Sequence, residues 1–164
     1  MVGIQHQVDE VKVKEDDWPN CERLGFIHKK KPMHGFCDNI EKRTLENTDF
    51  RRVLYTGKYS QLVLMHLRPL EEIGLEVHED TDQFFRVESG TGTVVIDGAI
   101  TPLSDGAAVL VPAGAYHNIS NTSATQPLLL YTLYAPAHHQ DGVAFATKAD
   151  AEASDEHFDG TTTE

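Results

Sequence analysis

Between residues 50 and 135 the chain alternates between short apolar runs and turns made of polar residues, Gly and Pro. The runs are rich in Val, Ile, Leu, Phe and Tyr. This predicts strands, because β-branched and aromatic side chains suit the pleated surface of a sheet. The predicted strands span 61–68, 83–87, 93–97, 99–103, 107–111 and 128–134, and a further one starts at His117. Strands at regular spacing, with turn signals between them, predict an all-β sandwich or barrel.

The chain outside these strands divides into two flanking parts. We expect an N-terminal extension over residues 1–38, a barrel over 39–140 and an acidic C-terminal segment over 141–164. Within that segment, residues 148–158 (KADAEASDEHF) favour a short helix, because Ala and Glu lose little conformational freedom in a helix. The remaining residues, 159–164, are expected to form a loose tail.

Length and charge narrow the function classes. The chain has 164 residues and a formal net charge of −12. The length suits a single domain, and the negative charge repels nucleic acid and anionic membranes, so neither is an expected partner. No run approaches a membrane-spanning length, and the N-terminus lacks the apolar segment of a signal peptide. We therefore expect a cytoplasmic protein, and its two cysteines are too few for a disulfide scaffold.

Two polar stretches carry candidate chemistry. In the first, Glu76 and His78 are two apart in a segment with strand character, so their side chains point to one face, roughly 6–7 Å apart, and can reach one metal ion. An acidic turn follows, and Gln83 opens the next strand, so its amide oxygen is expected to return beside them across a hairpin. In the second stretch, residues 106–121 (GAAVLVPAGAYHNISN), a strand stops at Pro112 and a tight turn leads to His117.

In this order, the two stretches resemble the two motifs of the cupin superfamily. The second motif, G-x5-P-x-G-x2-H-x3-N, is matched at every position, by Gly106, Pro112, Gly114, His117 and Asn121. The first motif, G-x5-H-x-H-x4-E-x6-G, keeps its spacing through Glu76, His78, Gln83 and Gly90. Three letters depart from it: Leu70 replaces the opening glycine, Glu76 the first histidine and Gln83 the glutamate.

The resemblance implies a cupin-type double-stranded β-helix, or jelly-roll barrel, with an N-terminal extension and a short C-terminal helix or tail. It covers about residues 39–139 and is greatest to small single-domain, mannose-6-phosphate-isomerase-like microbial cupins. It also implies a ligand set for one divalent transition metal (Zn, Fe, Mn, Ni or Co), formed by Glu76, His78, Gln83 and His117. The usual set of three histidines and one glutamate carries the same single negative charge, so the carboxylate is moved rather than lost.

Several interpretations of this set stay open. The four side chains are metal ligands, or they are polar residues lining an empty or sugar-holding cavity. If Glu76 does not bind the metal, it is a candidate general base beside it.

For function, the resemblance favours a metal-dependent enzyme acting on a small, oxygen-rich substrate. We expect isomerase-type chemistry on a sugar or sugar phosphate, because the sugar-phosphate isomerases of the superfamily also use Gln, His, Glu and His ligands, in another order. One alternative is an Fe(II)-dependent dioxygenase, since two His and one carboxylate suit that metal. The other is a non-catalytic carbohydrate- or metal-binding module. We also expect a homodimer in which the N-terminal forty or so residues cover an edge strand.

Other histidines and aromatic residues are expected outside the metal site. His66 is expected in the core, with a site contact as the alternative. Phe85 and Tyr131 are expected to line the barrel, and His138 and His139 to lie in a loop away from the chemistry. One further set could form a small zinc site, but its spacing fits no common finger, and we favour ordinary packing or exposure for its four members: Cys21, His28, His34 and Cys37.

Overall fold

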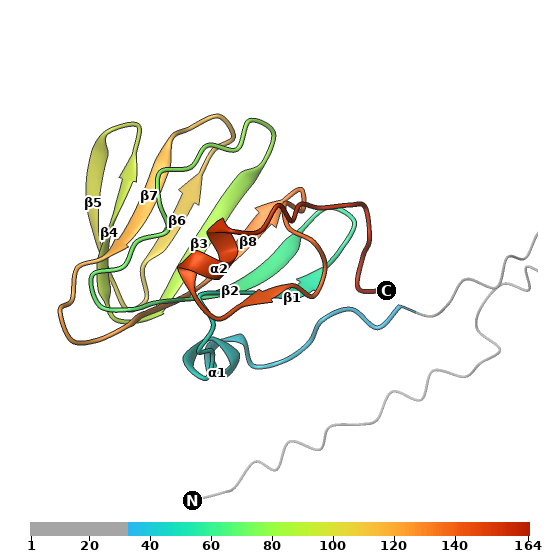
Figure 1. The fold of residues 1–164 in the computed structure, drawn as a ribbon, viewed down its shortest axis with the longest axis horizontal. Coiled ribbons are helices and arrows are strands. Elements are labelled where there is room, and N and C mark those ends of the chain that lie inside the picture. Colours follow the sequence, from blue (N-terminus) through green and yellow to red (C-terminus); the bar gives the residue numbers. More distant parts are fainter. Residues whose placement is uncertain (1–32) are drawn as a thin grey trace, which may run out of the picture. The chain divides into compact units, whose positions relative to one another are not determined.

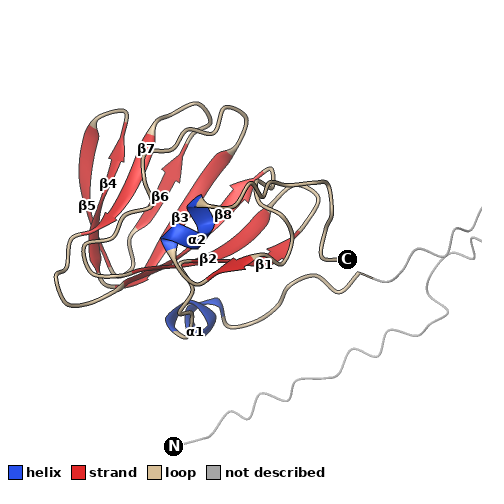
Figure 2. Ribbon diagram, in the orientation of Figure 1, coloured by secondary structure: helices blue, strands red, loops and turns tan. Residues whose placement is uncertain are grey.

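Two antiparallel sheets face each other in the computed structural model, which describes residues 33–164 (Figure 1). The larger sheet has the strand order β6-β3-β8-β2-β1-β9 and the smaller one β5-β4-β7. Figure 2 shows that strands dominate and that the two helices are short. The elements are α1 (Ile40–Leu45), β1 (Arg51–Thr56), β2 (Gln61–Leu67), β3 (Asp82–Ser89), β4 (Thr91–Ile96), β5 (Ala99–Ser104), β6 (Ala108–Val111), β7 (His117–Asn121), β8 (Leu128–Ala135), β9 (Ala144–Phe145) and α2 (Lys148–Glu152). The predicted all-β, cupin-type sandwich is confirmed.

The core lies between the facing sheets. Along β3 buried and less buried residues alternate, which is the pattern of a strand with one face on the core. In β2 every residue except His66 is buried, because its second face is covered by α1, which packs against β2, β3 and β8. The most deeply buried apolar side chains of the core are Val63, Met65, Leu67, Phe85, Val87, Ile119, Leu128 and Leu130.

Gly90, the last glycine of the first motif, has a backbone reason for its identity. It lies between β3 and β4 with a φ of +98°, a region that L-residues with side chains rarely adopt. A Cβ atom at this position would also collide with the carbonyl group of Pro127. The tight crossing from one sheet to the other therefore needs glycine.

The C-terminal segment differs from the sequence expectation in two ways. The predicted helix over 148–158 is only five residues long, Lys148–Glu152, although a capping box between Thr147 and Asp150 opens it well. Glu156, four residues after the end of this helix, instead contacts Arg51 and His139 of the barrel part. The tail predicted to be loose is bonded: the backbone N–H of Thr163 donates to the Thr56 carbonyl at 3.0 Å. The expected N-terminal extension lies almost entirely outside the described residues.

Candidate metal centre

Three side chains of the predicted set meet at one end of the barrel. Glu76, His78 and His117 each present one ligand atom, and these atoms all lie within 4.8 Å of one another. The Nε2 atom of His78 is 3.6 Å from Oε2 of Glu76. Imidazole nitrogen and carboxylate oxygen bind a metal at about 2.0–2.2 Å, so two ligands of one ion lie at most about twice that distance apart. Small shifts of the three side chains would bring their ligand atoms within this limit. This cluster could therefore hold a metal ion.

The backbone brings the cluster together differently from the hairpin we predicted. Residues around Glu76 form no regular strand; Glu76 makes an isolated antiparallel bridge with His117, and each residue's N–H donates to the other's carbonyl at 2.9 Å. Gly74, with a φ of +113°, interrupts the extended backbone just before the bridge. The segment thus continues the smaller sheet beyond β7. The hairpin prediction was wrong, because Gln83 belongs to β3 in the larger sheet, where it pairs with Val111 and Tyr134.

Gln83 nevertheless reaches His117 from the opposite sheet. Its Oε1 atom lies 2.9 Å from Nε2 of His117, and the carbonyl oxygen of Ala115 lies 3.1 Å from Nδ1 of the same ring. A neutral imidazole has a single N–H group and can donate to only one of these two oxygens. When the ring proton is on Nδ1 and is donated to the Ala115 carbonyl, Nε2 of His117 and Oε1 of Gln83 are both acceptors and repel each other. A cation bound to both atoms would remove this repulsion.

The cluster also contains buried polar atoms with no hydrogen-bond partner among the described residues: Oε2 of Glu76, Nε2 of His78 and Nε2 of Gln83. Each such atom costs about 1–3 kcal/mol of folding free energy. Exchanging the oxygen and nitrogen of the Gln83 amide would give His117 a donor, but it would leave the Glu76 and His78 atoms unpartnered. The donor set therefore fits a divalent cation better than a closed hydrogen-bond network.

Electrostatics keep Glu76 in the form that binds metal. Burial by itself raises the pKa of this carboxyl group. The nearby imidazole of His78, together with Arg51 and His117, outweighs burial and lowers the pKa of Glu76 below its usual value. Glu76 is therefore an ionised carboxylate at neutral pH.

Aromatic residues form the wall around the cluster. The ring of Phe85 is centred 6.2 Å from that of His117, and the ring of Tyr134 is 5.6 Å from that of His78. Phe85 lines the barrel as predicted. Tyr131 does not: it contacts Phe84, with ring centroids 6.3 Å apart, on the face of the larger sheet that points away from the core.

The sequence interpretation placed His138 and His139 in a loop away from the chemistry; both lie in that loop, but His138 packs beside the cluster. The ring of His138 is centred 4.3 Å from that of His78 and stacks on Tyr134 at 5.6 Å with an interplanar angle of 17°. Strand register is what brings His138 to the cluster: Tyr134 pairs with Gln83, so the residues that follow Tyr134 leave the sheet at the end where Gln83 lies.

The remaining candidates do not join the cluster. The Nδ1 atom of His66 lies 3.0 Å from the Asn47 carbonyl oxygen, on the face that α1 covers, so the alternative of a site contact was wrong. Of the proposed zinc set, Cys37 is an exposed free thiol and His34 is exposed, while the other two members lie outside the described residues.

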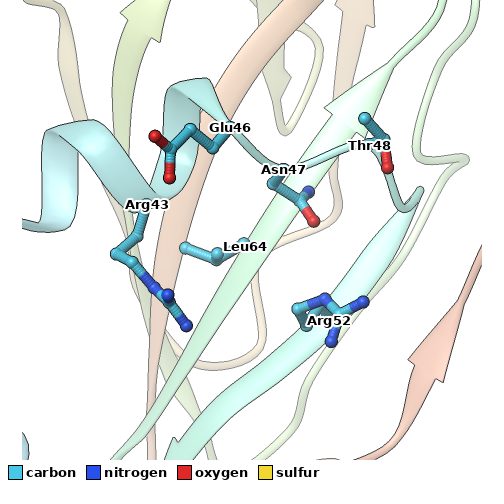
Figure 3. A pocket seen from close by; sticks show the side chains of 6 residues that line it. All are labelled: Arg43, Glu46, Asn47, Thr48, Arg52 and Leu64. Carbon is cyan, nitrogen blue, oxygen red and sulfur yellow. The ribbon is translucent and has the colours of Figure 1, made fainter.

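A cavity of about 240 Å³ lies between α1, the turn after it and the strands β1 and β2 (Figure 3). Its lining contains no member of the metal cluster. Arg43 and Arg52, which line it, are paired with the carboxylates of Asp38 and Asp49 respectively. Their positive charges are thus already compensated, and we assign this cavity no function.

Within the described residues, no helix has the length and apolar character needed to cross a bilayer.

Comparison with known proteins agrees with this architecture. Residues 63–134, which contain all four predicted ligands, match the Cupin domain model. The chain is 44% identical over 159 residues to the uncharacterized protein YrkC of Bacillus subtilis, covering 93% of this chain and 85% of that protein. The crystal structure of BH2720 from Bacillus halodurans is 42% identical and superposes with a TM-score of 0.71, covering 77% of this chain and 98% of that one. A Thermus thermophilus protein, TT1209, is 25% identical with a TM-score of 0.53, covering 61% and 96% of the two chains. The chain belongs to the cupin family.

Proposed function

We propose that this cupin binds one divalent transition metal through Glu76, His78, Gln83 and His117, and that it acts on a small, oxygen-rich substrate. The 2.9 Å separation between Oε1 of Gln83 and Nε2 of His117 carries the proposal: when the ring proton is on Nδ1, both atoms are acceptors, and one cation bound to both would remove their repulsion. The unpartnered atoms of Glu76 and His78 support it, since the same ion would satisfy them. Two imidazoles and one carboxylate suit Zn, Fe, Mn, Ni or Co.

Each side chain has a distinct role in this proposal. The Nδ1–H group of His117 donates to the Ala115 carbonyl, which orients the ring and leaves Nε2 available for the ion. Glu76 supplies the negative charge, and Gln83 adds a neutral oxygen, which leaves the ion more electron-poor than a second carboxylate would. The bound ion would polarise a carbonyl or hydroxyl oxygen of the substrate.

Within this class we propose isomerase-type chemistry on a sugar or sugar phosphate. Such a reaction requires a group that moves a proton between neighbouring carbons beside a polarised carbonyl. Glu76 supports this choice, because its Oε2 atom has no hydrogen-bond partner among the described residues and faces the cluster. If Glu76 does not bind the ion, this carboxylate is the base that carries the proton.

One observation favours a second candidate, an Fe(II)-dependent dioxygenase. The three clustered residues, Glu76, His78 and His117, form a two-histidine, one-carboxylate set, which is the donor combination of non-haem iron oxygenases. The two candidates differ in their need for oxygen. A non-catalytic carbohydrate- or metal-binding module is the third outcome that an experiment must separate.

Metal content is the first measurement. Protein purified without a polyhistidine tag should contain close to one equivalent of a transition metal, and Glu76→Gln should lose most of it. Glu79→Gln is the matched control, because Glu79 is an exposed carboxylate three residues away. A metal-free protein that also fails to take up added Zn, Fe, Mn, Ni or Co would overturn the proposal.

Turnover then distinguishes the chemistries. Aldose–ketose interconversion in the absence of oxygen is the expected result for the isomerase. Oxygen consumption by the iron-loaded protein would favour the dioxygenase instead. Stoichiometric metal without turnover on either panel would favour the binding module.

We also propose that the protein is a homodimer. A row of apolar side chains crosses the outer face of the larger sheet, where Leu110, Phe84 and Leu133 lie side by side in register, and Leu110 is 67% exposed. Light scattering at micromolar concentration should give twice the mass of the chain, and Leu110→Glu should shift it toward the monomer. A monomeric wild-type protein would contradict this proposal.

A further inference from the structure

Residues 154–164, the last part of the C-terminal segment, are joined to the barrel beside the metal cluster by the carboxylate of Glu156. Only 6% of the Glu156 side chain is exposed. Its Oε1 atom lies 2.7 Å from Nδ1 of His139 and 3.2 Å from Nη1 of Arg51, and its Oε2 atom accepts from the Gln140 N–H at 2.8 Å. Burial opposes the charge, but the His139 and Gln140 hydrogen bonds dominate and lower the pKa of Glu156 to about 2.

The loop held by Glu156 is bonded from the inside as well. Gln61, a fully buried residue of β2, accepts from the His139 N–H at 2.9 Å and donates to the His139 carbonyl at 2.7 Å. On the outside, the N–H of Phe158 donates to the carbonyl of His138 at 2.9 Å. A two-residue stretch after the last long strand is thus fixed on both sides, which is unusual for a surface loop.

This double anchoring determines where the His138 ring lies. The ring packs across His78 at 4.3 Å and stacks on Tyr134, while part of its surface stays open to solvent. No hydrogen bond to the ring nitrogens of His138 is found within residues 33–164. The ring therefore stands at the edge of the cluster, and neither of its nitrogens is committed to a hydrogen bond with the described residues.

His138 contributes no atom to the cluster of ligand atoms, which belong to Glu76, His78 and His117. Because His138 is exposed and its ring packs on that of His78, a small molecule that reaches the ion past His78 would pass close to the His138 ring. An imidazole offers such a ligand a donor or an acceptor, whereas a purely packing role would be served equally well by Phe.

We propose that His138 contacts the ligand bound at the metal centre, and that Glu156, acting through His139 and Gln140, is the positioning residue that holds it there. This inference rests on the proposed metal site. It extends the site to a second region of the chain, outside both cupin motifs.

The test uses two variants with separate readouts for metal and ligand. His138→Phe keeps the aromatic contact with Tyr134 and removes both ring nitrogens, and Glu156→Gln keeps the shape of the carboxylate but removes its charge. His157→Phe is the matched control, because His157 is an exposed histidine next to Glu156. Calorimetry gives the Co(II) dissociation constant. The visible spectrum of the Co(II) protein then follows binding of acetohydroxamate, a small probe that binds metals through two oxygen atoms.

We expect His138→Phe to leave the Co(II) dissociation constant within about twofold of wild type and to weaken acetohydroxamate binding about five- to tenfold, the loss of one hydrogen bond. Glu156→Gln should act in the same direction and less strongly, and His157→Phe should change neither constant. Unchanged acetohydroxamate binding in His138→Phe would overturn the inference. So would loss of Co(II) binding in that variant, because His138 would then be a metal ligand.

A measurement on the unmodified sequence covers the case in which Glu156→Gln folds poorly. In the Zn(II) protein, the ring-proton signals of His138, assigned by their absence in His138→Phe, should shift when acetohydroxamate is added. Signals that stay in place would contradict a contact. A wild-type protein that binds neither Co(II) nor Zn(II) would instead refute the metal site itself, and this inference with it.

Discussion

Two glutamates at one end of the barrel, both largely shielded from solvent, differ in how completely they are partnered. Glu156 has a histidine, an arginine and a backbone N–H within hydrogen-bond distance. Glu76 has one histidine at 3.6 Å, and its Oε2 atom has no hydrogen-bond partner among the described residues. A satisfied buried carboxylate stabilises the fold, whereas an unsatisfied one lowers stability and persists where a ligand completes it. The comparison therefore separates a structural carboxylate from a functional one.

The largest expected effect is on stability, from removing the satisfied carboxylate. Glu156→Ala leaves Arg51 and His139 without their common partner in a buried setting, and we expect a loss of about 4 kcal/mol in the free energy of unfolding. Urea denaturation, followed by far-ultraviolet circular dichroism, measures this loss. Glu152→Ala, which removes an exposed carboxylate paired with Lys148, should cost about 0.5 kcal/mol or less. Equal losses in the two variants would remove the distinction drawn here.

Acid should reproduce much of that loss. The pKa of Glu156 is lowered to about 2 in the folded protein from its ordinary value of 4.5, so the folded state favours the ionised form. Its contribution is fully present above about pH 4.5 and is lost as the pH falls toward 2. The urea midpoint of wild type should therefore fall more steeply below pH 4.5 than that of Glu156→Gln. Parallel curves for the two proteins would show that Glu156 carries no such linkage.

Glu76→Gln should give the opposite result to Glu156→Ala. Metal affinity should drop about a hundredfold, equivalent to about 2.7 kcal/mol, because the site loses its only negative charge. In the metal-free protein, stability should change little, because the Oε2 atom of Glu76 has no hydrogen-bond partner among the described residues to lose. Competition with a chromophoric chelator measures the first quantity and thermal unfolding of the metal-free protein the second. A large loss of metal-free stability would place Glu76 with Glu156 as a structural residue.

The smallest effect is expected at Gln83. Gln83→Glu restores the carboxylate usual in the first cupin motif and should tighten metal binding about tenfold, since a charged oxygen replaces a neutral one. In the metal-free protein it brings a second carboxylate near Glu76, which should raise the pKa of one of them. The same chelator competition, repeated between pH 5 and 8, tests both statements. Unchanged affinity would show that the residue at position 83 does not reach the ion.

The sequence was most informative where a local rule acts through a few neighbouring residues. Proline and glycine punctuation located β2, β5, β6 and β8 to within a residue or two, because strand ends follow from turn chemistry. It was least informative about pairing partners. Glu76 was expected beside Gln83 across a hairpin, but it pairs with His117, and nothing local distinguishes the two arrangements.

The C-terminal segment shows the same limit from another side. Residues 154–158 favour helix by composition, yet Glu156 lies outside the helix and contacts Arg51 and His139. Arg51 is 105 positions away in the sequence, and His139 is 17 positions away. Those partners are brought together by the sheet, so no window of sequence around Glu156 contains the information. His138 was missed for the same reason.

What the sequence alone determined is the β-sandwich and three of the side chains that meet in it, Glu76, His78 and His117, since alternation, turn residues and motif spacing are properties of adjacent residues. Only the tertiary structure decided that Gln83 reaches His117 from the opposite sheet and that a C-terminal carboxylate holds a second histidine at the rim. The physical reason is that contacts between distant segments depend on strand register and sheet packing, which the chain acquires only when the whole core is buried.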